Sequence, residues 1–317
     1  MFETVLEEIR RADTIILYRH KNPDGDALGS QIGLHALLRE NFPEKTVYQV
    51  GDEAGRYAFM KESSMDDVPD EVFAGALAII LDCGAPHLVS DERWRLAARS
   101  VRIDHHLFCG KFCDEEVIDS GFESCCGMIA LLAQEQGFRL TPLAAESLYT
   151  GMVTDSGRFR FDSVGARTLR LAAWLREVPF DTNAMYRNLY SEDLSALKRR
   201  SAFIDRIQLS DHAVAWVYTS AAEIAAMGVT PFDVSRGMVN TMADLKGVRI
   251  WVNFAEAPGE GVYCELRSSG VNINPIAVKY GGGGHAAASG ATVPDHETAM
   301  AMLADLDTLA KETAEND

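Results

Sequence analysis

Short apolar runs alternate with amphipathic stretches through the first half of the chain. Apolar residues recur at helical spacing in Glu3–Arg11, whereas Thr14–Tyr18 (TIILY) and Leu77–Leu81 (LAIIL) are continuous apolar runs. Continuous runs of this length are typical of strands covered on both faces. Further strands are predicted at 45–50 and 100–103, and further helices at 27–40, 125–136 and 142–150. Strands that alternate with helices predict a parallel α/β sheet.

The second half opens with a mostly helical stretch, residues 168–207, and then returns to strands. Helix breaks are expected at Pro179 and near Asp193, and Ser191 is placed to cap the connecting helix that follows. Strands are predicted at 213–218, 248–254 and 261–266, and a closing helix at 296–311. We therefore expect two α/β domains, the second smaller, with the boundaries 1–190, 191–206 for the connecting helix, and 207–317.

Composition narrows the class of protein. A length of 317 residues suits two domains, and 47% hydrophobic with 24% charged residues is typical of a globular chain. Acidic residues outnumber basic ones 47 to 30, which gives a formal net charge of −17. This charge argues against tight binding of long nucleic acid, which relies on a basic surface. A small anionic substrate remains compatible where local cations offset the field.

No apolar run approaches the length that crosses a bilayer, and the longest covers only residues 76–81. The N-terminal sequence MFETVLEEIRR lacks the layout of a secretory signal. We expect a cytoplasmic protein with no membrane partner.

Six cysteines do not form a disulfide framework in a chain of this length, and we expect free thiols. Cys109 and Cys113 follow two adjacent histidines, which raises a zinc site as an alternative. No CxxC pair accompanies them, so free thiols are favoured.

Acidic and histidine side chains cluster after the predicted strands. The residues concerned are His20, Asp24, Asp26, Asp82, Asp104, His105, His106 and Asp155. Ligands bind at the carboxyl ends of the strands in open parallel sheets, so these loops are expected to converge. Carboxylates gathered in a small volume repel one another unless cations neutralise them. Mixed imidazole and carboxylate donors suit manganese.

Each of these residues also has a plainer interpretation. A single aspartate after a strand usually caps a helix or closes a turn, and Asp24 and Asp26 could be turn formers only. Adjacent histidines on an exposed loop often have no function. The joint pattern, spread over four separate segments, favours a dinuclear metal site.

The second half contains Gly281–Gly284 followed by His285. Successive glycines can present their N–H groups to an anion or let a phosphate approach the backbone. Alternatively, a helix ends at Tyr280 with a glycine cap, which needs only one glycine. Arg267 lies at the end of a predicted strand, where an isolated arginine is usually solvated.

Five segments together resemble the DHH phosphoesterase superfamily. HKNPDGDALGS, LDCG, IDHH and TDSGRFRF are similar to its four ordered motifs, and GGGGHAAASG is similar to the DHH-associated substrate-binding domain. The arrangement most resembles the bacterial group that degrades nanoRNA and dephosphorylates pAp (3′-phosphoadenosine 5′-phosphate), and its cyclic-di-AMP or pApA phosphodiesterase relatives.

The resemblance implies roles for the clustered residues. One manganese ion would be held by His20, Asp24 and Asp82, and a second by Asp26, Asp82, His105 and Asp155, with Asp82 bridging. His106 would contact the substrate phosphate, and Asp104 would orient an imidazole. In the second domain, Arg267, Ser268, His285 and Gly282, Gly283 and Gly284 would grip the terminal nucleotide, with the active site in the cleft between the domains.

The function implied is hydrolysis of very short oligoribonucleotides to mononucleotides, and of pAp to AMP, by direct attack of water at two metal ions. A cyclic-di-AMP phosphodiesterase is the alternative within this class, and the motifs do not separate the two. A nucleotide-binding protein without catalysis is disfavoured because every expected ligand position is filled. An inorganic pyrophosphatase is disfavoured by the glycine-rich second domain. A homodimer is left open.

Overall fold

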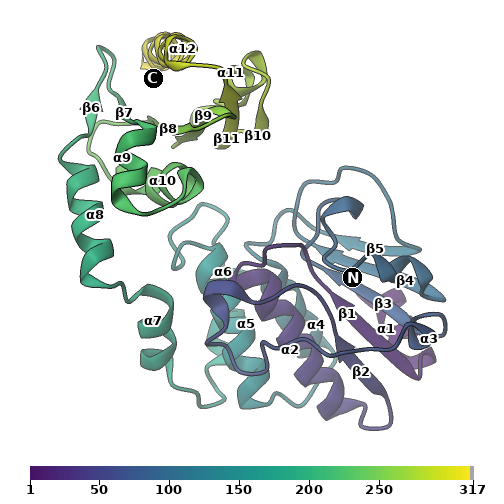
Figure 1. The fold of residues 1–317 in the computed structure, drawn as a ribbon. Helices are drawn as coiled ribbons and strands as arrows, with labels where there is room; N and C mark the ends of the chain where they lie inside the picture. Colours follow the sequence, from purple (N-terminus) through teal and green to yellow (C-terminus); the bar gives the residue numbers. More distant parts are fainter. Residues whose placement is uncertain (315–317) are drawn as a thin grey trace. The chain divides into compact units, whose positions relative to one another are not determined.

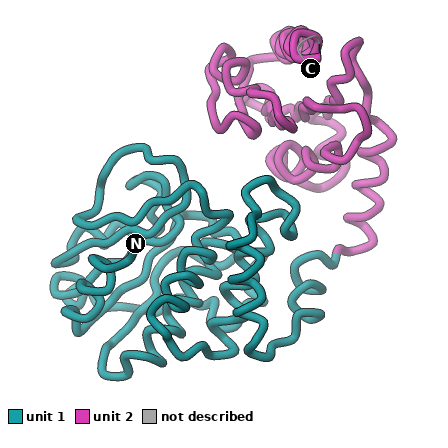
Figure 2. The backbone as a smooth tube through the Cα atoms, turned by 180° about the vertical axis from the view of Figure 1, so that it is seen from behind, with its two compact units in different colours: residues 1–191 teal, residues 192–317 magenta. Residues whose placement is uncertain are grey.

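The computed structural model describes residues 1–314, so the last three residues of the expected second domain, 315–317, lie outside it. The chain divides into two compact units, Met1–Ser191 and Glu192–Asp317 (Figure 2). They are called unit 1 and unit 2 below.

Unit 1 contains a sheet of five strands in the order β2-β1-β3-β4-β5 (Figure 1). The strands are β1 (Thr14–Tyr18), β2 (Thr46–Gln49), β3 (Leu77–Leu81), β4 (Arg99–Asp104) and β5 (Glu115–Ile118). All neighbouring strands run parallel, which confirms the predicted parallel α/β sheet. The sequence analysis missed β5 because its EEVI sequence carries two glutamates and has no apolar run.

Unit 1 contains seven helices among its described residues, and they do not all pack on the same face of the sheet. They are α1 (Glu3–Arg11), α2 (Gly25–Asn41), α3 (Asp70–Phe73), α4 (Cys125–Glu135), α5 (Pro142–Asp155), α6 (Ala166–Leu175) and α7 (Thr182–Tyr190). Ile15 and Leu17 of β1 point into the large core that α1, α2, α4 and α5 share. Ile16 and Tyr18 point into a second core, which contains Phe73 of α3. Both faces of β1 are therefore buried, as its continuous apolar run predicts.

Three glycines allow α2 and α5 to pack closely. Gly25, Gly29 and Gly33 are spaced four residues apart, and an added Cβ at each would lie 2.4, 2.6 and 2.5 Å from the nearest atom of α5. Any side chain at these positions would push the helices apart. The close approach brings the start of α2, with Asp26, beside the end of α5, with Asp155.

Unit 2 begins with α8 (Leu194–Ile204), and the predicted cap of this helix is wrong. Ser191 instead ends α7, where its N–H donates to the Arg187 carbonyl at 2.8 Å. Asp193 occupies the N-cap position of α8. Because α7 extends to Tyr190, the chain needs residues 191–193 to turn before a new helix can begin.

The sheet of unit 2 has six strands in the order β10-β11-β9-β8-β7-β6. Its strands are β6 (Gln208–Leu209), β7 (Val214–Thr219), β8 (Ile250–Ala257), β9 (Gly261–Ser268), β10 (Gly283–His285) and β11 (Ala288–Val293). Its other helices are α9 (Ala221–Met227), α10 (Pro231–Met238), α11 (Asn274–Lys279) and α12 (His296–Ala314). β7 and β8 run parallel and the other pairs antiparallel, so this sheet is mixed.

Two layers cover the sheet of unit 2. Met302 and Leu306 of α12 and Ala277 of α11 pack with the buried side chains of β8 and β9 on one face. On the other face, the side-chain amide of Asn253 on β8 donates to the Val234 and Ser235 carbonyls of α10. Among the described residues, no helix is both long and apolar enough to span a membrane.

Candidate functional site

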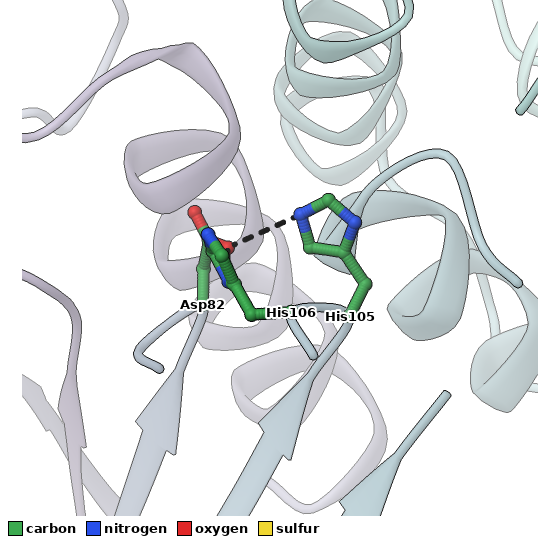
Figure 3. Close-up of side chains that lie close together, drawn as sticks. All are labelled: Asp82, His105 and His106. Carbon is green, nitrogen blue, oxygen red and sulfur yellow. Dashed lines mark ion pairs between the residues drawn. The ribbon is translucent and has the colours of Figure 1, made fainter. Parts of the chain in front are cut away.

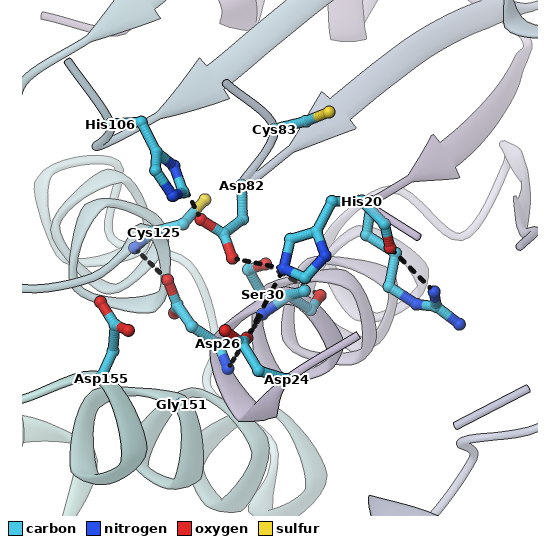
Figure 4. Close-up of polar contacts among 12 residues, drawn as sticks. His20, Asp24, Asp26, Ser30, Asp82, Cys83, His106, Cys125, Gly151 and Asp155 are labelled. Atoms are coloured by element: carbon cyan, nitrogen blue, oxygen red, sulfur yellow. Dashed lines mark hydrogen bonds and ion pairs between the residues drawn. The ribbon is translucent and has the colours of Figure 1, made fainter. Parts of the chain in front are cut away.

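The acidic and histidine residues of unit 1 gather at the carboxyl edge of its sheet (Figure 4). His20, Asp24 and Asp26 lie in the β1–α2 connection, Asp82 follows β3 directly, and His105 follows β4. Asp155 was also expected in a loop at the end of a strand, but it does not lie there. It is the last residue of α5, which runs five residues beyond the predicted end and is held against α2 by the glycine packing described above.

Asp82 lies at the centre of the cluster. Its φ is +50°, a left-handed conformation that aspartate tolerates better than most residues, and only 2% of its surface is exposed. Its Oδ2 lies 3.6 Å from His20 Nε2 (Figure 4). Its Oδ1 lies 3.5 Å from His105 Nε2 (Figure 3). Oδ1 is buried without a hydrogen-bond donor. A buried carboxylate oxygen in this state requires a compensating cation.

His20 and Asp24 form one side of the cluster. His20 Nδ1 is 2.8 Å from the Lys21 carbonyl, so Nδ1–H donates there, and Nε2 lies 3.8 Å from Asp24 Oδ1. Burial alone would lower the pKa of His20. The hydrogen bond to Asp24 and the charge of Asp82 outweigh burial and raise this pKa to about 9. Burial raises the pKa of Asp24, but the His20 partner lowers it to about 2. These shifts favour a protonated, positively charged His20 beside an ionised Asp24.

Asp26 and Asp155 form the other side, around His105. Both Asp26 carboxylate oxygens accept backbone N–H groups at the start of α4, from Cys125 at 2.7 Å and from Cys126 at 2.8 Å. His105 Nε2 lies 3.7 Å from Asp26 Oδ2 and 3.3 Å from Asp155 Oδ2. These contacts hold a fully buried carboxylate in one orientation and place it beside a second acid.

Burial and repulsion between the carboxylates shift the pKa values on this side of the cluster. Burial, followed by the charges of Asp82 and Asp155, raises the pKa of Asp26 well above its ordinary value. Burial also raises the pKa of Asp155 to about 7. Burial lowers the pKa of His105, but Asp82 and the other acids raise it to about 11. Protons held on these groups offset part of the negative charge of the cluster.

The donor set fits divalent cations. The side chains form three groups whose ligand atoms lie within 4.8 Å of one another: His20, Asp24 and Asp82; Asp26, His105 and Asp155; and Asp82, His105 and His106. All six residues expected as ligands are thus brought together. Carboxylate oxygen with imidazole nitrogen is a donor set suited to manganese. No cysteine belongs to any such group among residues 1–314, and all six cysteines are free thiols.

His106 is oriented by a buried chain of charges. Its Nδ1 lies 2.7 Å from Asp104 Oδ1, and Asp104 Oδ2 lies 3.2 Å from Arg102 Nη2. Asp104 and Arg102 have no exposed surface. The hydrogen bond to Asp104 raises the pKa of His106. The sequence analysis missed Arg102, although its position two residues before Asp104 on one strand places both side chains on the same face.

In unit 2 the strand register brings two of the expected substrate residues to one face. Ala288 of β11 pairs with both Arg267 of β9 and His285 of β10, so all three side chains point to the same side. Arg267 forms an ion pair with Glu265 at 3.0 Å, so it is not the solvated arginine of the alternative interpretation. Ser268 points to the opposite face and donates its hydroxyl to the Val271 carbonyl at 2.5 Å.

The glycine run combines a helix end and a tight hairpin. Gly281 has a φ of +79° directly after the end of α11, as a capping glycine would. An added Cβ at Gly282 would lie 2.0 Å from the Gly290 carbonyl oxygen, and Gly284 has a φ of +133°. Gly283 and Gly284 belong to β10, which pairs with β11. The run therefore needs more than one glycine because the hairpin is closely packed.

Unit 1 has an all-parallel sheet with an acid and histidine cluster at its carboxyl edge, and unit 2 carries a glycine-rich hairpin. This combination defines a phosphoesterase of the DHH class. The model of the DHH family, N-terminal domain, matches residues 14–152, and that of the DHHA1 domain matches residues 222–312. The chain belongs to the DHH family.

Similar proteins extend over nearly the whole chain. The bifunctional oligoribonuclease and PAP phosphatase NrnA of Bacillus subtilis is 36% identical over 97% of this chain and 98% of its own length. A protein from Streptococcus mutans called a probable bifunctional oligoribonuclease and PAP phosphatase NrnA is 31% identical over 92% of this chain and 93% of its own length. The cyclic-di-AMP phosphodiesterase GdpP of Geobacillus thermodenitrificans is 26% identical over 91% of this chain and 46% of its own length.

Among solved structures, an exopolyphosphatase-related protein from Bacteroides fragilis is similar with a TM-score of 0.88 and 25% identity. The match covers 98% of this chain and 97% of that protein. The two units thus occur together in a similar chain.

Proposed function

We propose that this protein hydrolyses very short oligoribonucleotides, such as pApA, to mononucleotides, and pAp to AMP, with manganese as its cofactor. The cluster around Asp82 carries the proposal, because two of its donor groups share Asp82, and the buried Oδ1 of Asp82 accepts no hydrogen bond. Full-length similarity to proteins called oligoribonuclease and PAP phosphatase supports the choice of substrates.

In this proposal His20, Asp24 and Asp82 hold one divalent ion, and Asp26, Asp82, His105 and Asp155 hold the second. When bound, such divalent ions would neutralise the charge of the phosphoryl group and lower the pKa of the attacking water.

The surrounding residues fix these donors in place. His105 Nδ1 lies 3.3 Å from the Phe122 carbonyl, and His20 makes the similar contact to Lys21. Such contacts set the tautomer and direct Nε2 inwards. His106, held by Asp104 and Arg102, has its Nε2 available to donate to an oxygen of the substrate phosphate. Asp104 and Arg102 are therefore positioning residues in this proposal.

Unit 2 supplies the substrate contacts. Arg267, His285 and Gly282 to Gly284 would hold the phosphate and sugar of one nucleotide, and Ser268 would support the loop after β9. The net charge of −17 favours short substrates, because a longer strand would meet repulsion beyond its bound end.

The test is a comparison of rates on pApA, pAp and cyclic-di-AMP by the purified full chain with manganese. We expect release of AMP from pApA and pAp at rates that chelation of the metal abolishes. A rate on cyclic-di-AMP that exceeds both would assign the alternative activity. Binding of pApA without any turnover over a full manganese titration would show a nucleotide-binding protein instead.

A further inference from the structure

The loop after β2 contacts the segment that carries His20 through one carboxylate. Asp52 lies in this loop, and its Oδ1 accepts a hydrogen bond from Arg19 Nη1 at 2.6 Å. Its Oδ2 accepts the backbone N–H of Asn22, also at 2.6 Å. The Arg19 side chain has no exposed surface, whereas 37% of the Asp52 side chain is exposed. The roles assigned so far use neither Asp52 nor Arg19.

The peptide group between Lys21 and Asn22 joins this carboxylate to His20. Its carbonyl accepts from His20 Nδ1 at 2.8 Å, and its N–H donates to Asp52 Oδ2. Hydrogen bonds in such a chain polarise one another, so the bond at one end of the peptide strengthens the bond at the other. Histidines that bind metals usually donate from their second ring nitrogen to a carboxylate or a carbonyl. Here a carbonyl and a carboxylate act in series.

The backbone conformation of Asn22 shows why this peptide needs a partner. Its φ is +51°, a left-handed value that is uncommon for residues other than glycine, although asparagine tolerates it. Rotation of the Lys21–Asn22 peptide would relieve this conformation and turn the carbonyl away from His20 Nδ1. The same rotation would remove the N–H from Asp52, so the carboxylate opposes it. Asp52 therefore keeps the carbonyl directed at the imidazole.

We propose that Asp52 is a positioning residue for the metal site, which acts through the Lys21–Asn22 peptide to direct His20 Nε2 into the cluster. The inference rests on the proposed function, because that function assigns His20 as a ligand of one of two divalent ions.

Asp52→Asn separates the two contacts of the carboxylate. A guanidinium group only donates hydrogen bonds, so the amide oxygen must face Arg19. The amide NH₂ group then faces the Asn22 N–H, and two donors oppose each other. Arg19 also retains its backbone acceptors, the carbonyls of Asp52 and His20. The substitution conserves size, so we expect the fold to be kept while the bond to Asn22 is lost.

Asp114→Asn is the matched control. The Asp114 side chain is 43% exposed, accepts the Ser100 N–H at 2.8 Å and lies 3.4 Å from Arg99. It therefore combines a backbone N–H with an arginine, as Asp52 does. Ser100 lies at the start of β4, however, and the cluster lies at the carboxyl edge of the sheet.

Manganese binding to the purified full chain, measured by calorimetry without substrate, tests the inference. The unaltered chain should bind two ions. Asp52→Asn should weaken one of them about 10- to 100-fold and change the other little, the usual effect of losing a group that orients a metal ligand. Asp114→Asn should change neither. In a His20→Ala background, Asp52→Asn should have no further effect, because residues that act through one contact are not additive.

Asn22→Gly should recover part of the affinity lost in Asp52→Asn, because glycine adopts the left-handed φ readily. Unchanged binding of both ions in Asp52→Asn would overturn the inference, and so would an equal loss for both. A further loss of about tenfold in the His20→Ala background would also overturn it, since Asp52 would then act by another route. An unaltered chain that binds fewer than two ions would do the same.

Rates on pApA separate this inference from the proposed function. Selective loss of one ion in Asp52→Asn, without hydrolysis of pApA by the unaltered chain, would contradict the function alone. Hydrolysis by the unaltered chain, with both ions and the rate retained in Asp52→Asn, would contradict the positioning role alone.

Discussion

The acid and histidine cluster of unit 1 and the glycine-rich face of unit 2 present their polar groups in opposite ways. In unit 1, Asp26 and Asp82 are buried, and backbone N–H groups hold both oxygens of Asp26 before any ligand arrives. In unit 2, His285 is exposed, and Arg267 has an intramolecular partner that a ligand must share or displace.

The difference indicates which property each region controls. A preorganised cluster of like charges has a large cost when its cation is missing, so its residues should determine metal content and the chemical step. An open face with one paired arginine should determine capture of the substrate. Four predictions test this division, from the largest expected effect to the smallest.

Asp82→Asn should have the largest effect, lowering kcat by more than about 100-fold. Removal of a group that only orients a metal ligand typically lowers metal affinity or activity 10- to 100-fold. The loss should be larger for Asp82, because it belongs to two of the three donor groups. Asparagine tolerates the left-handed φ of this position, so the backbone need not change. Steady-state rates on pApA, beside the exposed Asp67→Ala as control, provide the measurement. A near-normal rate would contradict the ligand assignment.

Manganese should stabilise the unaltered protein at neutral pH. A free metal concentration of 100 Kd corresponds to about 2.7 kcal/mol of added unfolding free energy. The apparent affinity should fall as the pH is lowered, because the metal-free cluster holds protons on Asp155 (pKa about 7), His20 (about 9) and His105 (about 11) that the cation must displace. Thermal unfolding at pH 8 and pH 6 with increasing manganese measures this. Equal shifts at both values, or a shift retained in Asp82→Asn, would be inconsistent with the cluster as the site.

Gly151→Ala should destabilise unit 1 by about 1–3 kcal/mol, because overpacking a tight core has costs of this size. The added methyl group would lie 2.2 Å from Cys126 Sγ and 3.1 Å from Asp26 Oδ1. We expect weaker manganese binding in addition, since Asp26 would be displaced. Denaturant unfolding with and without metal measures both effects. Gly75→Ala is the matched control, since no atom lies within 4 Å of its added Cβ, and a similar loss there would refute the packing argument.

Arg267→Ala should raise KM for pApA about tenfold or more, the usual value of a hydrogen bond to a charged group, with kcat and metal content nearly unchanged. Arg267→Lys should recover only part of the loss, because an ammonium group lacks the planar fork of donors. Initial rates and metal analysis of the purified variants measure the split. Loss of bound manganese in Arg267→Ala would remove the distinction between the two regions.

The sequence predicted most of unit 1 because its strands carry unambiguous signals. Continuous apolar runs located β1 and β3, and the acids that follow these strands located the cluster. Asp155 was placed in the cluster but on the wrong kind of element, because nothing in LYTGMVTD marks where the helix ends. The four-residue spacing of Gly25, Gly29 and Gly33 was present in the sequence and indicates close helix packing.

Unit 2 was harder to predict. A run of four glycines allows several backbone conformations, and only pairing with β11 selects the hairpin. The Arg267–Glu265 contact follows from alternation along a strand, yet whether the two side chains meet depends on rotamers that a sequence does not determine. The buried partner Arg102 was missed in unit 1 for a related reason, because an arginine in a strand is ordinarily exposed.

The bonds from the amides of Cys125 and Cys126 to Asp26 join positions about a hundred residues apart along the chain. The first motif therefore acquires its final shape only after α4 has docked, and Asp155 joins later still. During synthesis, a chain that has emerged only as far as His105, directly after β4, would already carry five of the six donors but could not align them. Metal capture can thus report that unit 1 has completed its folding, which makes cation uptake a marker of maturation.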